Sequence, residues 1–129
     1  LQEEYGAATE LFFIIGLDAF LELPSWRQAP DLLRSCHFVV VSRPGVEFLS
    51  LCHMPLLPAM ERASLAALDA RQQDRLDIPI PNGIGLTLLR LPPCDVSASE
   101  IRRRLKNGLS LSDLLPAPVE SYIIRFGVY

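Results

Sequence analysis

The chain has 129 residues, half of them hydrophobic, and its formal net charge at pH 7 is −3. This length suits one compact domain with a hydrophobic core, and the slightly acidic charge argues against a nucleic-acid-binding surface. No uninterrupted apolar segment approaches the ~20 residues of a membrane-spanning helix, so we expect neither a membrane span nor a secretory signal.

Three short apolar runs predict β-strands near residues 11–15, 37–42 and 86–91. Gly16 ends the first run, an Arg-Pro-Gly turn ends the second and two prolines end the third, and such residues commonly terminate strands. Runs that are apolar at every position are typical of strands buried on both faces of a parallel sheet. An edge strand of this composition would attract another strand, so we expect an exposed edge to associate with further sheet or a second copy of the chain.

Helices are predicted near residues 59–70, 97–107 and 118–127, with shorter helical segments between the first two strands. In the last helix, Pro118 suits the first position and Gly127 suits the C-terminal cap. Strands that alternate with helices imply right-handed crossovers and a mostly parallel sheet. We therefore predict an α/β fold of about three parallel strands with flanking helices and a C-terminal helical segment, with residues 1–129 forming the C-terminal portion of a single domain.

The predicted helix at 97–107 begins with a well-defined capping motif. Ser97 is the expected N-cap, and Glu100 three residues later completes a Ser-x-x-Glu capping box. One face of this helix is apolar and should pack inward (Ala98, Ile101 and Leu105).

Three consecutive arginines follow this cap, and helical geometry directs them differently. Side chains lean toward the helix N-terminus, so Arg102 reaches back over the first turn, whereas Arg103 points to the opposite side and Arg104 to one flank. The first turn offers free backbone N–H groups and the positive end of the helix dipole, which together bind anions, and a guanidinium suits phosphate oxygens. The alternative is an ordinary solvated basic face, and the residue pattern leaves both interpretations open.

Further candidates follow the first two predicted strands, at the edge where an open α/β sheet binds its ligands. Gly16 would let a ligand approach the backbone, and Asp18 could bind hydroxyl groups or metal-coordinated phosphate, or simply cap the next helix. Trp26 could stack on an aromatic ring or pack in the core. Arg43 could face a ligand or remain a solvated turn residue.

The three cysteines are odd in number and widely spaced (Cys36, Cys52 and Cys94). This pattern argues against a disulfide framework and favours a reducing cytoplasm. Two of them adjoin the histidines His37 and His53, but adjacent Cys-His pairs lack the usual spacing of zinc ligands. We therefore expect no metal site among these residues.

Several motifs together resemble those of the bacterial nicotinate-nucleotide adenylyltransferase family. They are G-x-D and L-P-x-W within residues 12–26, R-P-G after the second predicted strand, S-x-x-x-x-R at 97–102 and L-L-P-x-x-V-x-x-Y-I at 114–123. In order and spacing they cover most of the chain except about residues 46–85. The S-x-x-x-x-R element is shared by the wider nucleotidylyltransferase superfamily, whereas L-P-x-W with R-P-G points to the nicotinate branch.

The resemblance implies a partial Rossmann-like fold and a reaction in which nicotinate mononucleotide attacks ATP, with Mg²⁺, to give deamido-NAD and pyrophosphate. It favours the phosphate-site interpretation of the helix and implies a catalytic role for Arg102. It also implies a set of ATP-binding residues (Gly16, Asp18, Ser97, Ser99, Ile101 and Arg102). The implied nicotinate mononucleotide-binding residues are Trp26 by stacking, the backbone at Arg27 and the side chain of Arg43.

The chain departs from the family in lacking its G-x-F-D-P-x-H-x-G-H signature, which His37 and His53 do not match. It also begins with Leu1, and we expect it to be the C-terminal portion of a longer enzyme without full activity by itself. One alternative is a non-catalytic nucleotide-binding or interaction module that pairs with another chain. Another is an adenylyltransferase with a different acceptor, such as nicotinamide mononucleotide or phosphopantetheine.

Overall fold

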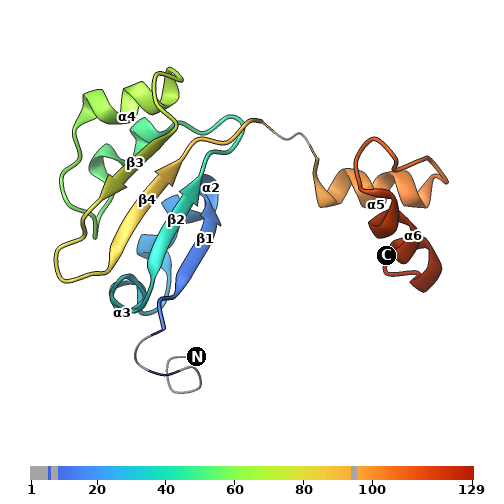
Figure 1. Cartoon of the computed structure of the whole chain (residues 1–129), viewed down its shortest axis with the longest axis horizontal. Helices are drawn as coiled ribbons and strands as arrows, with labels where there is room; N and C mark the ends of the chain where they lie inside the picture. Colours follow the sequence, from blue (N-terminus) through green and yellow to red (C-terminus); the bar gives the residue numbers. More distant parts are fainter. Residues whose placement is uncertain (1–5, 7–8, 94–95) are drawn as a thin grey trace. The chain divides into compact units, whose positions relative to one another are not determined.

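The computed structural model describes residue 6 and residues 9–93 and 96–129, which fall into two compact units. The first unit, Leu1–Pro93, contains a β-sheet with helices, and the second, Cys94–Tyr129, is helical (Figure 1). The predicted α/β class and mostly parallel sheet are confirmed. Of the residues named from the sequence, Leu1 and Cys94 lie outside the described part of the chain.

Four strands lie side by side in the order β1-β2-β4-β3 (Figure 1). The three predicted strands are confirmed as the parallel strands β1 (Phe12–Gly16), β2 (His37–Val41) and β4 (Gly85–Leu89). Gly16 lies opposite Val41, and Val41 lies opposite Leu89. The carboxyl ends of the parallel strands therefore meet at one edge of the sheet, where Asp18 and Arg43 follow.

The fourth strand, β3 (Arg75–Ile78), is antiparallel to β4 and is not among the predicted strands. Its residues alternate, with Ile78 buried and Leu76 half-buried while Arg75 and Asp77 are exposed. A run of four residues between a charged segment and a proline-rich loop gives only a weak strand signal. The cross-strand hydrogen bonds to β4, which the sequence does not display, define this strand.

Short helices connect the strands of the first unit. The segment between β1 and β2 forms α2 (Leu17–Leu21), the 3-10 helix η1 (Leu23–Ser25) and α3 (Ala29–Ser35), and η2 (Phe48–His53) and α4 (Arg62–Asp69) follow β2. The core lies between these helices and one face of the sheet. The ring of Phe20 in α2 lies 5.4 Å from that of Phe38 in β2, and Leu65 and Leu68 of α4 are fully buried. Pro24 lies in η1.

The prediction that the strands are buried on both faces is wrong for β1. Ile15 is buried, but the side chains of Phe12 and Ile14 are 59% and 70% exposed. Phe12 and Ile14 lie on the face of β1 opposite to Ile15, and the described residues leave that face of the strand largely uncovered. The prediction fits β4 better. This strand lies between β2 and β3, and its side chains Leu86, Thr87 and Leu88 are all buried.

The second unit contains the two predicted C-terminal helices, α5 (Ala98–Lys106) and α6 (Ala117–Phe126). Gly127 has a left-handed conformation, with φ of 58°, and ends α6 as predicted, whereas Pro118 is the second helical residue rather than the first. The packed centre of the unit consists of three buried side chains (Ile101, Leu111 and Ile123). Ala98 was expected to face inward but is exposed. In the described part of the chain, no helix has the length and apolar character needed to cross a membrane.

Candidate functional site

Three residues predicted from the sequence lie together at the carboxyl ends of β1 and β2. The Oδ1 atom of Asp18, in the first turn of α2, lies 3.3 Å from Nε of Arg43, and both side chains are about half exposed. Gly16 lies beneath this pair. A Cβ atom there would be 2.5 Å from the Asp18 Oδ1 atom and 3.1 Å from Cδ and Nε of Arg43. Glycine therefore allows an exposed ion pair to lie directly against the end of the strand.

Trp26 and Arg27 follow η1 in the first unit. Trp26 is half-buried, and its ring meets that of Phe13 edge to face, with centroids 6.4 Å apart and planes inclined at 79°. Arg27 is exposed. The tryptophan ring is thus partly packed against the core, while part of its surface stays accessible. This position is compatible both with packing and with stacking on an aromatic ligand.

The remaining candidates lie at the start of α5 in the second unit. The Ser97 hydroxyl oxygen accepts a hydrogen bond of 3.1 Å from the backbone N–H of Glu100, as the capping motif predicts. The Arg102 guanidinium lies back toward the first turn, donating to the Ser99 hydroxyl at 3.4 Å and lying 5.7 Å from the centroid of the Tyr129 ring. Ile101 is buried, so it can offer a ligand only its backbone.

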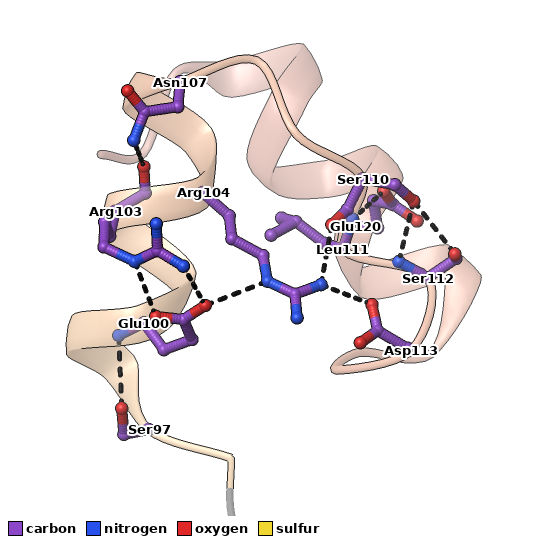
Figure 2. A network of polar contacts seen from close by, with 10 residues as sticks. All are labelled: Ser97, Glu100, Arg103, Arg104, Asn107, Ser110, Leu111, Ser112, Asp113 and Glu120. Carbon is purple, nitrogen blue, oxygen red and sulfur yellow. Dashed lines mark hydrogen bonds and ion pairs between the residues drawn. The ribbon is translucent and has the colours of Figure 1, made fainter.

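The second half of the predicted capping box is not formed. Among the described residues, the Glu100 carboxylate accepts hydrogen bonds from Arg103 at 2.6 and 2.8 Å and from Nε of Arg104 at 3.0 Å, not from the Ser97 backbone (Figure 2). Hydrogen bonds from Arg103, and then from Arg104, lower the pKa of Glu100 from its ordinary 4.5 to about 2. Glu100 is therefore fully ionised at neutral pH.

Arg104 connects this carboxylate to the segment before α6. Figure 2 shows its guanidinium between Glu100 on one side and Ser110 and Asp113 on the other. It donates to the Asp113 carboxylate at 2.6 Å and to the Ser110 carbonyl at 3.1 Å. These contacts leave its side chain only 25% exposed, and they lower the pKa of Asp113.

No protein-family model matches the chain, but curated relatives match it over nearly its whole length. Proteins named probable nicotinate-nucleotide adenylyltransferase are 32% identical over 128 residues in Moorella thermoacetica, 38% over 126 residues in Pelobacter propionicus and 39% over 129 residues in Yersinia pestis. These matches cover 98–100% of this chain and 50–56% of the relatives. Over nearly its whole length, the chain is therefore similar to about half of each of these proteins.

This chain spans about half the length of the nicotinate-nucleotide adenylyltransferases that it matches. Its candidate residues form two groups, one at the strand ends of the first unit and one at the first turn of α5. Each group carries at least one arginine and one further polar side chain able to contact a phosphate or a sugar hydroxyl. Such groups suit a nucleotide ligand.

In the described part of the chain, no cluster of three or more His, Cys, Asp or Glu side chains could hold a metal ion. Cys36 is buried, and burial raises the pKa of its thiol, away from the thiolate form that binds metals. Cys52 is a free cysteine and is half-buried.

A second polar cluster, which the sequence analysis does not identify, crosses three strands of the sheet. The Thr87 hydroxyl donates to the Asp77 carboxylate at 2.6 Å, so its oxygen must accept the 2.8 Å hydrogen bond from Nε2 of His37. Arg75 donates to Asp77 at 2.8 and 3.0 Å and, together with Thr87, lowers the pKa of that carboxylate. These hydrogen bonds join side chains of the neighbouring strands β2, β4 and β3, so the cluster supports the register of the strands.

Proposed function

We propose that this chain forms part of an enzyme that transfers the adenylyl group of ATP to nicotinate mononucleotide. A phosphate oxygen of the mononucleotide would attack the α-phosphorus of ATP, the bond from that phosphorus to the bridging oxygen would break, and pyrophosphate would leave. Deamido-NAD is the other product. The relatives' names support this activity, and the two groups of candidate residues supply contacts that it needs.

The observation that carries the proposal is the position of Arg102. Of the three consecutive arginines, Arg103 and Arg104 are ion-paired with carboxylates, whereas Arg102 makes no such pair with any described residue. Its guanidinium lies instead beside Ser99 at the first turn of α5. The first-turn N–H groups and an unneutralised guanidinium together form a suitable site for the phosphates of ATP.

The chemistry of this transfer requires little from the protein beyond positioning and charge stabilisation. Ser97, Ser99, the backbone at Ile101 and Arg102 would hold the ATP phosphates, and Arg102 would neutralise charge as pyrophosphate leaves. We propose that ATP is used as its Mg²⁺ complex.

The first unit would supply the remaining contacts. Gly16 and Asp18 would line the nucleotide crevice, with Arg43 beside the mononucleotide. Trp26 would stack on the nicotinate ring, and the backbone at Arg27 would meet its carboxylate. The ion pair between Asp18 and Arg43 supports this assignment, because it holds two polar groups at the strand ends, where open α/β sheets bind ligands.

A hybrid protein tests the activity, with this chain replacing the matching 129-residue segment of the Yersinia pestis relative. We expect the hybrid to release pyrophosphate from ATP when nicotinate mononucleotide is present, and to use nicotinamide mononucleotide or phosphopantetheine far less well. Circular dichroism establishes that the hybrid is folded. A folded hybrid that lacks this activity would refute the proposed reaction, and one that prefers another acceptor would refute the proposed substrate.

A further inference from the structure

The helix that begins at Ser97 presents a problem for phosphate binding, because its first turn also contains a carboxylate. Glu100 is the third helical residue, a position where the helix dipole favours a negative charge. In a capping box this side chain would turn back to the N-cap backbone N–H. A carboxylate there would occupy a phosphate-binding donor and repel the phosphate itself.

The structure shows that Glu100 is drawn to the opposite side. Arg103 binds both carboxylate oxygens, and Arg104 binds one of them (Figure 2). Arg104 cannot easily move away, because Asp113 and the Ser110 carbonyl hold its guanidinium from the other side. Two carboxylates, Glu100 and Asp113, therefore face two guanidinium groups, and the cluster has no net charge.

We propose that Arg103 and Arg104 are positioning residues that hold the Glu100 carboxylate away from the phosphate-binding turn. This inference rests on the proposed function. Their positive charges are balanced by the carboxylates of Glu100 and Asp113, so these two arginines do not act on the substrate directly. Arg102 then remains the cation that faces the first turn. Of the three consecutive arginines, Arg102 would contact the phosphates. Arg103 and Arg104 would keep the Glu100 carboxylate away from that contact.

A purely structural role for the same cluster predicts something different. If the cluster only stabilised the second unit, removing Glu100 would be as harmful as removing the two arginines. Under our proposal the two changes have opposite effects, because Glu100 itself is the competing group. The substitution Glu100→Gln separates the two explanations.

The experiment measures ATP binding to the chain from the shifts of backbone amide NMR signals in residues 97–102, and the KM for ATP in the hybrid. The double variant R103Q/R104Q is compared with the triple variant E100Q/R103Q/R104Q and with E100Q. The control is K106Q/R125Q, which removes two positive charges from exposed positions of α5 and α6 outside the cluster.

We expect R103Q/R104Q to raise the dissociation constant and the KM for ATP by about three- to tenfold, the scale of one like charge at close range, with little effect on the KM for nicotinate mononucleotide. The triple variant should recover to within about twofold of the unsubstituted protein, although its cluster is still broken, and E100Q should bind ATP about twofold more tightly. The proposal is overturned if the triple variant stays as weak as R103Q/R104Q, if E100Q weakens binding, or if K106Q/R125Q causes an equal loss. A hybrid with no turnover before any substitution refutes the proposed function instead.

Discussion

Glu100 is the residue whose titration reports most directly on the second unit. Its pKa of about 2 lies below the ordinary 4.5 because Arg103 and Arg104 donate to its carboxylate. A carboxyl group with a lowered pKa stabilises the folded state above pH 4.5, and this contribution disappears as the pH falls toward 2. We predict an NMR titration midpoint near 2 for the side-chain carboxyl carbon. A midpoint near 4.5 would mean that the pairs seen in Figure 2 do not form in solution.

Gly16 shows how a single residue can matter to the site without mattering much to the fold. Its φ of −70° is open to any residue, so Gly16→Ala introduces no backbone strain. The new Cβ would displace the side chains of Asp18 and Arg43, and such flexible groups can move at little cost. We predict a stability change within about 1 kcal/mol in denaturant unfolding, together with at least a fivefold loss in kcat/KM of the hybrid. An unchanged kcat/KM would show that the ion pair has no part in the reaction.

The ring of Trp26 packs edge to face with that of Phe13 and keeps part of its surface exposed. Trp26→Ala removes the proposed stacking surface for the nicotinate ring. We predict that the KM of the hybrid for nicotinate mononucleotide rises much more than its KM for ATP, while Trp26→Phe retains most of the affinity. Equal losses for both substrates would indicate a packing role only.

At the level of secondary-structure elements, β1 is an edge strand with exposed apolar side chains. Phe12 and Ile14 are the most exposed of them, and unpaired apolar edges promote association. We predict that the chain by itself self-associates with rising concentration in sedimentation experiments, and that Ile14→Lys reduces this association. Ile84→Lys is the matched control, because Ile84 is 53% exposed but lies outside the strands. Equal effects of both substitutions would contradict a specific role for the β1 edge.

The same elements show how far the sequence predicts the fold. Continuous apolar runs identified β1, β2 and β4, and cap residues identified α5 and α6, because these signals are local. The run at 75–78 was missed since its strand character depends on pairing with β4. The exposure of β1 was also missed, because an apolar run does not reveal whether both faces are covered.

Some contacts of the candidate residues can be predicted from local sequence spacing, whereas others depend on residues far apart in the sequence. The lean of Arg102 toward Ser99 was predictable from helix geometry, and the i+3 and i+4 spacing of Arg103 and Arg104 from Glu100 could have indicated their pairing. The contact between Asp18 and Arg43 is different, since it joins residues far apart in the sequence. Only the parallel pairing of β1 with β2 brings them together.

At the scale of the whole molecule, we propose that the first turn of α5 binds the phosphates of ATP through Arg102. The most direct test is the turnover of the hybrid protein carrying Arg102→Ala, measured as pyrophosphate release at saturating substrates. We predict that kcat falls at least about tenfold, because a positioned donor acts on charge that develops in the transition state. Arg125→Ala, which removes an exposed arginine from α6, should leave kcat unchanged. An unchanged kcat in Arg102→Ala would contradict the account and return Arg102 to the role of a solvated surface residue.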